Sequence, residues 1–246
     1  MRAVVAYDGT NYRGFQRQAG GPTVQEVLEA ALTQVTKVKT TIVAAGRTDT
    51  GVHAEGQVIA FNTGWRHPLG ALLRGMNAAL PLDVAVREIA EVAADFHPRY
   101  DAQSRHYRYT VYNHPVRLPL ARQMSLHVPG RLDVAAMQEA ASLLVGQHDL
   151  AAFGRPPKGD NTVRNVLRAE WSSAPPWLYF HIEATAFLYR MVRNLVGTML
   201  QVGLGRMTVD VFGQVLASRD RAKVGPAAKP WGLCLVEVKY PILPQV

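Results

Sequence analysis

The chain has 246 residues, which is enough for one large domain or two small ones. Apolar residues make up 48% of it and charged residues 19%, so it can bury a core, and a disordered chain or a coiled coil is excluded. A single cysteine, Cys234, cannot form an internal disulfide and is expected to pack as a small apolar residue. The first residues lack the apolar stretch of a secretory signal, so we expect a cytoplasmic protein.

Positive charge is concentrated in the second part of the chain. The formal net charge is +8, and arginine supplies 21 of the 27 basic side chains. Residues 1–100 carry ten basic and nine acidic side chains, whereas residues 101–246 carry 17 and ten. Guanidinium groups donate two hydrogen bonds to a phosphate at once. Composition alone therefore allows a nucleic-acid partner, and equally a basic protein that has no such partner.

The first hundred residues are predicted to alternate strands and helices. A capping box of Thr23 and Glu26 predicts a helix that begins there, and apolar residues three or four apart predict another over residues 68–80. Strands are expected at residues 3–7, 40–45, 57–61 and 84–89. This β-α-β-β-α-β order is typical of a ferredoxin-like unit.

A similar order is predicted after residue 100. Strands are expected at residues 104–112, 163–171, 177–185 and 232–240, and helices at 133–145, 187–202 and 209–217. We therefore expect an α+β fold of two ferredoxin-like halves, residues 1–103 and 104–246, with a mainly antiparallel sheet and an active-site cleft between the halves. The longest apolar helix candidate, residues 187–202, contains Arg190 and Arg193, which argues against a membrane span.

The densest group of side chains that could take part in catalysis lies at residues 45–53, which contain Arg47, Asp49 and His53 together with two glycines. Glycines allow a tight turn and the close approach of a ligand. Arg47 beside Asp49 would keep the carboxylate ionised, as a nucleophile requires. On spacing alone the favoured interpretation is a capped turn, in which the Asp and Thr side chains bond nearby amides and Arg47 points to solvent.

Arginines alternate with aromatic residues on the strand that begins near residue 104. Period-two alternation places Tyr107 and Tyr109 on one face and His106 and Arg108 on the other. A tyrosine beside a carboxylate could stack on an extruded base. Packing in the core is the other interpretation, and for Tyr109 it is the one we expect. No histidine or cysteine spacing forms a closed set of metal ligands, so no metal site is predicted.

Several motifs together resemble the signature of the tRNA pseudouridine synthase A family. Gly46-Arg47-Thr48-Asp49 followed by Gly51-Val52-His53 is similar to the motif that carries the family's catalytic aspartate. Thr50 and Pro98 depart from the family pattern, which usually has alanine at both positions. The other segments that match in order are Tyr7–Gly9, Gly14–Gln18, Thr23–Gln25, Asp95–His97, Arg105–Tyr109, Phe187 and Met191–Gly197.

The resemblance implies a function and a set of roles. The family isomerises uridine to pseudouridine at positions 38, 39 and 40 of the tRNA anticodon stem-loop, as a homodimer without a cofactor. Asp49 takes the place of the nucleophile, and Tyr107 that of the ring lining the uracil pocket. Arg193 would pair with the nucleophile, and Arg47 would help to extrude the target nucleotide.

Two other functions remain open on the sequence. A non-catalytic RNA-binding module of ferredoxin-like halves could use Tyr107 for stacking and the excess arginines for phosphate contacts. A metal-dependent hydrolase could use Asp49 and His53. Binding without isomerisation would indicate the first, and loss of activity in EDTA the second.

Overall fold

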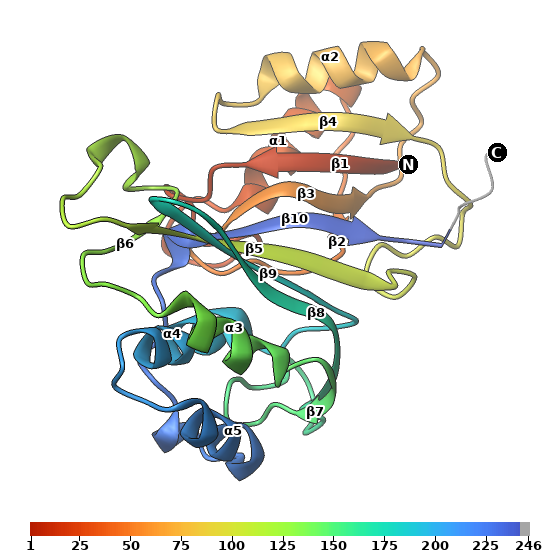
Figure 1. Ribbon diagram of the computed structural model, residues 1–246. Coiled ribbons are helices and arrows are strands. Elements are labelled where there is room, and N and C mark those ends of the chain that lie inside the picture. Colours follow the sequence, from red (N-terminus) through yellow and green to blue (C-terminus); the bar gives the residue numbers. More distant parts are fainter. Residues whose placement is uncertain (242–246) are drawn as a thin grey trace. The chain divides into compact units, whose positions relative to one another are not determined.

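The computed structural model describes residues 1–241 (Figure 1). Contacts divide the described residues into two compact units, Met1–Gln103 with residues 234–241, and Ser104–Leu233. Both units combine a mainly antiparallel sheet with helices, so the fold is α+β, as predicted. No helix within the described residues is both long and apolar enough to span a bilayer.

The first unit has the predicted β-α-β-β-α-β order. Its elements are β1 (Arg2–Tyr7), α1 (Val24–Thr36), β2 (Val43–Ala44), β3 (His53–Ala60), α2 (Leu69–Ala79), β4 (Val84–Ala90) and β10 (Leu233–Lys239). The strand order is β4-β1-β3-β10, and β2 pairs with β3. All these pairs are antiparallel except β10 with β3, where Cys234 lies opposite His53.

The capping box at the start of α1 is present, and Thr23 and Glu26 bond each other's backbone. Leu28 and Leu32 of α1 and Leu72 and Met76 of α2 are fully buried, as the spacing predicts. Helix α2 packs along β4 and against α1 (Figure 1).

Two strands of this unit differ from their predicted bounds. The β-branched run at residues 40–45 gives a strand of only two residues, because the Ile42 N–H bonds the side chain of Glu29 instead of a strand. The strand predicted at 57–61 already begins at His53. Gly56 lies inside it, where a Cβ would be 2.3 Å from the carbonyl oxygen of Val236, so glycine allows β10 to approach.

The second unit contains more strands than predicted. Its elements are β5 (Ser104–Asn113), β6 (Leu126–Val128), α3 (Val134–Ser142), β7 (Gly146–Asp149), β8 (Val163–Ala174), β9 (Trp177–Ala184), α4 (Met191–Gly203) and α5 (Val209–Ser218). Single 3₁₀ turns lie at Pro119–Ala121, Arg221–Lys223 and Pro230–Gly232. The sheet order is β5-β9-β8-β7, all antiparallel, and β6 runs parallel to β5. Helices α3, α4 and α5 pack together (Figure 1).

The last strand groups with the first unit, whereas we expected residues 104–246 to stay together. Strand β10 groups with the first unit because it pairs in parallel with β3, and the sequence of β10 does not predict this pairing. Cys234 is buried there, as expected. The helix predicted from residue 187 begins only at Met191, because Arg190 adopts a left-handed conformation with φ 61°.

Candidate active site

Residues 46–52, here called the Asp49 loop, connect β2 to β3 in the first unit. Asp49 is half-buried, Arg47 is exposed and Thr48 is buried. The N–H of Val52 donates to the Asp49 carbonyl at 3.1 Å, which closes a turn at the aspartate. Thr50, the departure from the family pattern, is exposed.

A buried polar network holds the loop from the interior of the sheet. The Tyr7 hydroxyl lies 2.7 Å from Thr48 Oγ1, and Gln57 Nε2 donates to the Gly46 carbonyl at 3.0 Å and lies 3.5 Å from the same hydroxyl. All three side chains are at least 94% buried. Burial raises the pKa of the Tyr7 phenol above its ordinary value, although the bonds with Thr48 and Gln57 oppose the rise.

A second clamp comes from the segment between β1 and α1. A Cβ at Gly9 would lie 2.0 Å from the Val52 carbonyl oxygen. Gly14 has φ 84°, and a Cβ there would lie 2.6 Å from the Thr48 oxygen, so both contacts require glycine. The N–H of Phe15 donates to the Thr48 carbonyl at 3.1 Å. The backbone of the Asp49 loop is therefore fixed on both sides.

His53 belongs to this framework. Its ring is 2% exposed, Nδ1 accepts the N–H of Gly9 at 3.1 Å, and the same atom lies 3.0 Å from Asp8 Oδ1. These contacts give His53 a positioning role beneath the turn. Within residues 1–241 no group of three or more His, Cys, Asp or Glu side chains could hold a metal ion.

Tyr107 and Arg193 lie in the second unit. Tyr107 on β5 is 9% exposed, and its ring meets that of Phe187 edge-on, with centroids 4.9 Å apart. Arg193 on α4 is half-buried, and its Nε donates to the Ala228 carbonyl at 2.7 Å. Tyr109 is fully buried and donates to the Lys229 carbonyl at 2.7 Å, so core packing is correct for it. Burial raises the pKa of Tyr109, and the charge of Arg193 opposes that rise.

The predicted site residues thus fall into two pairs. Arg47 and Asp49 share one loop of the first unit, and Tyr107 and Arg193 lie on β5 and α4 of the second. The pairing of Asp49 with Arg193 stays a prediction.

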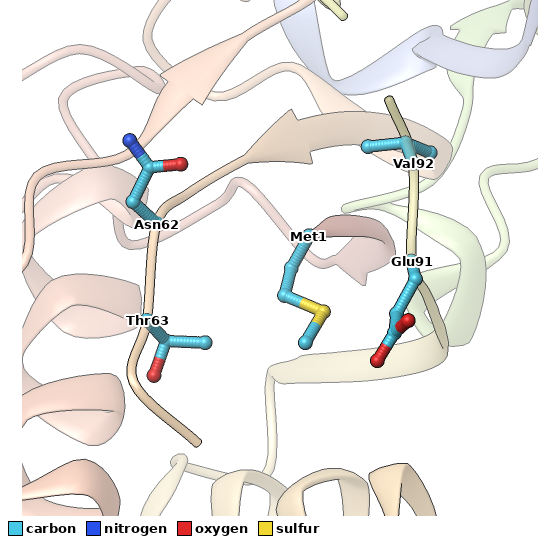
Figure 2. Close-up of a pocket in the computed structure, with 5 residues that line it drawn as sticks. All are labelled: Met1, Asn62, Thr63, Glu91 and Val92. Atoms are coloured by element: carbon cyan, nitrogen blue, oxygen red, sulfur yellow. The ribbon is translucent and has the colours of Figure 1, made fainter. Parts of the chain in front are cut away.

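A pocket of about 230 Å³ in the first unit contains none of these residues. Figure 2 shows Met1 between Asn62 and Thr63, which follow β3, and Glu91 and Val92, which follow β4. The Asp49 loop precedes β3, so this pocket lies at the other end of that strand. We assign it no part in the site.

Tyr7 and Gln57 are site residues whose role the sequence does not predict. Tyr7 ends one expected strand and begins a segment that matches the family, and Gln57 begins another expected strand. The one available signal was a polar side chain at the start of a predicted buried strand, which needs a buried partner.

Comparison with known proteins agrees with the motifs. The profile of the tRNA pseudouridine synthase family matches residues 3–101 and 140–241. The chain is 47% identical to a protein of Chloroflexus aurantiacus named tRNA pseudouridine synthase A, over 97% of this chain and 87% of that one. Proteins of the same name from Moorella thermoacetica and Geotalea uraniireducens are 45% and 44% identical over 98% of this chain and 99% of theirs. Among solved structures, a chain of a Cbf5-Nop10-Gar1 complex is similar with a TM-score of 0.41 and 14% identity, over 96% of this chain and 48% of that chain. The motif around Asp49, the other matching segments and these identities along nearly the whole length show that the chain belongs to the tRNA pseudouridine synthase A family.

Proposed function

We propose that this protein isomerises uridine to pseudouridine at positions 38, 39 and 40 in the anticodon stem-loop of tRNA, with Asp49 as the nucleophile. The observation that carries the proposal is the family motif at Asp49 on a loop whose backbone is fixed by buried bonds. A reacting group must be held within a fraction of an ångström of its productive geometry, and these contacts supply that rigidity.

The reaction breaks the bond between N1 of uracil and C1′ of ribose and joins C5 of the same base to C1′. C5 loses a proton and N1 gains one, so substrate and product have the same composition and neither a redox agent nor a nucleotide energy source is required. Asp49 would attack C1′ of the ribose or C6 of the pyrimidine, or assist formation of a glycal. All three routes need an ionised carboxylate.

The other predicted residues bind the target nucleotide. Tyr107 would hold the detached uracil while it rotates and is a candidate for removing the C5 proton. Arg193 would pair with Asp49, and the exposed Arg47 would help to extrude the nucleotide. Extrusion costs a few kcal/mol and least in a loop, which suits the anticodon arm. We further propose two ferredoxin-like halves with the site between them, a homodimer, and action in the cytoplasm.

Release of tritium from tRNA that carries 5-tritiated uridine tests Asp49 directly. We expect Asp49→Asn to keep the melting temperature and tRNA affinity of the unchanged protein while tritium release falls below detection. Asp210→Asn, the same change at an exposed position of α5, is the matched control and should release tritium normally. Substantial turnover by Asp49→Asn would refute the assignment.

Mapping tests the substrate. Pseudouridine in bulk tRNA from cells lacking the gene can be located by carbodiimide adducts and primer extension. We expect the signal to disappear only from the anticodon arm, and loss from the T arm or from ribosomal RNA would overturn the proposal. Binding of tRNA without isomerisation by the unchanged protein would indicate an RNA-binding module, and activity abolished by EDTA would indicate a metal-dependent enzyme.

A further inference from the structure

Two aromatic residues of the second unit, Phe187 and Tyr189, lie two residues apart, and the ring of Phe187 contacts that of Tyr107. Tyr189 forms an isolated β-bridge, and exposure alternates along residues 187–189: Phe187 is half-buried, Leu188 is 4% exposed and Tyr189 is 45% exposed. In an extended segment, residues two apart point to the same side. Phe187 and Tyr189 therefore share a side, and Phe187 also meets Tyr107 edge-on. The order along this side is Tyr107, Phe187, Tyr189.

The backbone under Tyr189 is held firmly although its ring is exposed. The N–H of Tyr189 donates to the Arg155 carbonyl at 2.8 Å, and the two residues form an isolated β-bridge. A Cβ at Gly154 would lie 2.5 Å from the Cβ of Leu188, so the segments approach as closely as glycine permits. The ring is thus presented on a rigid support.

Arg190 lies against the exposed ring of Tyr189. It has φ 61°, a left-handed conformation that costs free energy for a residue with a side chain, and such strain is concentrated at functional sites. Its guanidinium carbon lies 5.1 Å from the centroid of the Tyr189 ring. Arg190 and Arg155 are both exposed. An exposed tyrosine flanked by arginines is the combination that stacks on single-stranded bases and contacts the adjoining phosphates.

We propose that Tyr189, with Arg190 across its ring, stacks on the nucleotide next to the target uridine of tRNA, and that Arg155 contacts the phosphate beside it. The inference rests on the proposed function and deepens it, because it assigns a binding residue to the nucleotide next to the target uridine in the same tRNA. Phe187 and Tyr189 are two residues apart, at most about 7 Å along an extended chain. That step suits consecutive nucleotides whose bases are splayed apart for recognition.

Affinity for an anticodon stem-loop RNA tests the stacking, measured in the Asp49→Asn background so that no turnover occurs. Tyr189→Leu should weaken binding about 5- to 150-fold, whereas Tyr189→Phe, which keeps the ring, should stay within about twofold. Because the ring is exposed, both variants should keep the melting temperature. Equal affinity of the leucine and phenylalanine variants would overturn the proposal.

Stem-loops that lack the base on either side of the target give a sharper test. The unchanged protein should bind the RNA that lacks the stacked base more weakly than the intact RNA. Tyr189→Leu should bind both RNAs equally, because the substitution and the missing base remove the same contact. One of the two flanking positions should show this effect. Losses that simply add at both positions would mean that Tyr189 touches neither base.

Salt dependence tests Arg155. Arg155→Gln should make the slope of log affinity against log salt shallower by about 0.7, the value for one contact with a single strand. Arg206→Gln, at another exposed position of the same unit, should leave the slope unchanged. An unchanged slope for Arg155→Gln, or an equal reduction for both variants, would refute a specific contact.

Turnover separates this inference from the proposed function. Tyr189→Leu should raise KM with little change in kcat, because a stacked neighbour binds substrate and transition state alike. If the unchanged protein released no tritium, the proposed function would fail. If it turned over normally and Tyr189→Leu bound RNA equally well, only the inference would fail.

Discussion

The Tyr7 hydroxyl is the interior support of the Asp49 loop, and its removal is predicted to be costly. Tyr7→Phe leaves Thr48 Oγ1 buried without its 2.7 Å partner, and a buried polar group left unpaired costs about 1–3 kcal/mol. We expect the free energy of unfolding in urea to fall by that amount. We also expect kcat to fall more than KM rises, because the loop that holds Asp49 is loosened while the RNA contacts remain.

A second substitution distinguishes an unpaired hydroxyl from lost packing. Thr48→Val replaces the hydroxyl with a methyl group of nearly the same shape, and removing both partners of a buried hydrogen bond can be almost neutral. The double variant Tyr7→Phe with Thr48→Val should therefore recover most of the lost stability. Strictly additive losses in this double-mutant cycle would mean that the two hydroxyls do not depend on each other.

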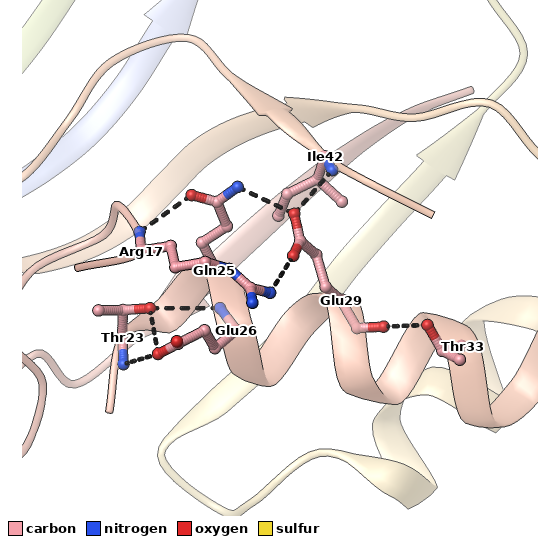
Figure 3. Close-up of polar contacts among 7 residues, drawn as sticks. All are labelled: Arg17, Thr23, Gln25, Glu26, Glu29, Thr33 and Ile42. Atoms are coloured by element: carbon pink, nitrogen blue, oxygen red, sulfur yellow. Dashed lines mark hydrogen bonds and ion pairs between the residues drawn. The ribbon is translucent and has the colours of Figure 1, made fainter. Parts of the chain in front are cut away.

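At the scale of elements, Glu29 of α1 joins three segments of the first unit (Figure 3). Its carboxylate accepts hydrogen bonds from the buried N–H of Ile42 at 3.1 Å, from Nε2 of Gln25 at 2.9 Å and from one guanidinium N–H of Arg17. The Glu29 side chain is 11% exposed, whereas that of Arg17 is 57% exposed. The bond to Ile42 should therefore matter more for stability than the ion pair.

Three variants separate these contributions in urea unfolding. Glu29→Ala leaves the Ile42 N–H unpaired and should cost about 1–3 kcal/mol. Glu29→Gln keeps one oxygen to accept from Ile42 but loses the charge and the second oxygen, which accepts from the exposed Arg17, and Arg17→Gln removes that exposed partner, so each should cost less than about 1 kcal/mol. If glutamine at position 29 destabilised as much as alanine, the ion pair would be the main contribution.

The elements that the sequence predicts correctly are those whose main signals lie within the element itself. The capping box and the apolar spacing of α1 and α2 lie within each helix, and both helices are where they were expected. Strand β7 has the sequence Gly-Gln-His-Asp, without alternation or β-branched residues, and forms because β8 offers a pairing edge. The start of α4 differs from its predicted bound because Arg190 is left-handed, and the N–H of the residue before it, Tyr189, bonds the carbonyl of the distant Arg155.

The same distinction holds for the site. The motif letters identify Asp49 because the reacting group and its glycines are adjacent in sequence. Tyr7 and Gln57 are 41 residues before and nine residues after Thr48, and only the pairing of β1 with β3 brings them under one loop. A pattern of residues along one sequence does not predict a contact that depends on how two strands are paired.

At the scale of the whole molecule, the net charge of +8 predicts how binding responds to salt. Each phosphate neutralised by a basic side chain releases counterions, so log affinity for RNA should fall linearly with log salt concentration. With several phosphate contacts we expect affinity for tRNA to fall at least about tenfold between 50 and 200 mM KCl. Filter binding or fluorescence anisotropy measures it, with thermal melting as the control for folding.

Turnover should respond differently from binding over the same range of salt. The contacts that fix the Asp49 loop are buried neutral hydrogen bonds, which salt does not screen appreciably. KM should therefore rise with KCl while kcat at saturating tRNA stays nearly constant. If kcat fell in parallel with affinity, an exposed ion pair would be part of the chemical step, and Arg47, the exposed arginine beside Asp49, would be the first residue to replace.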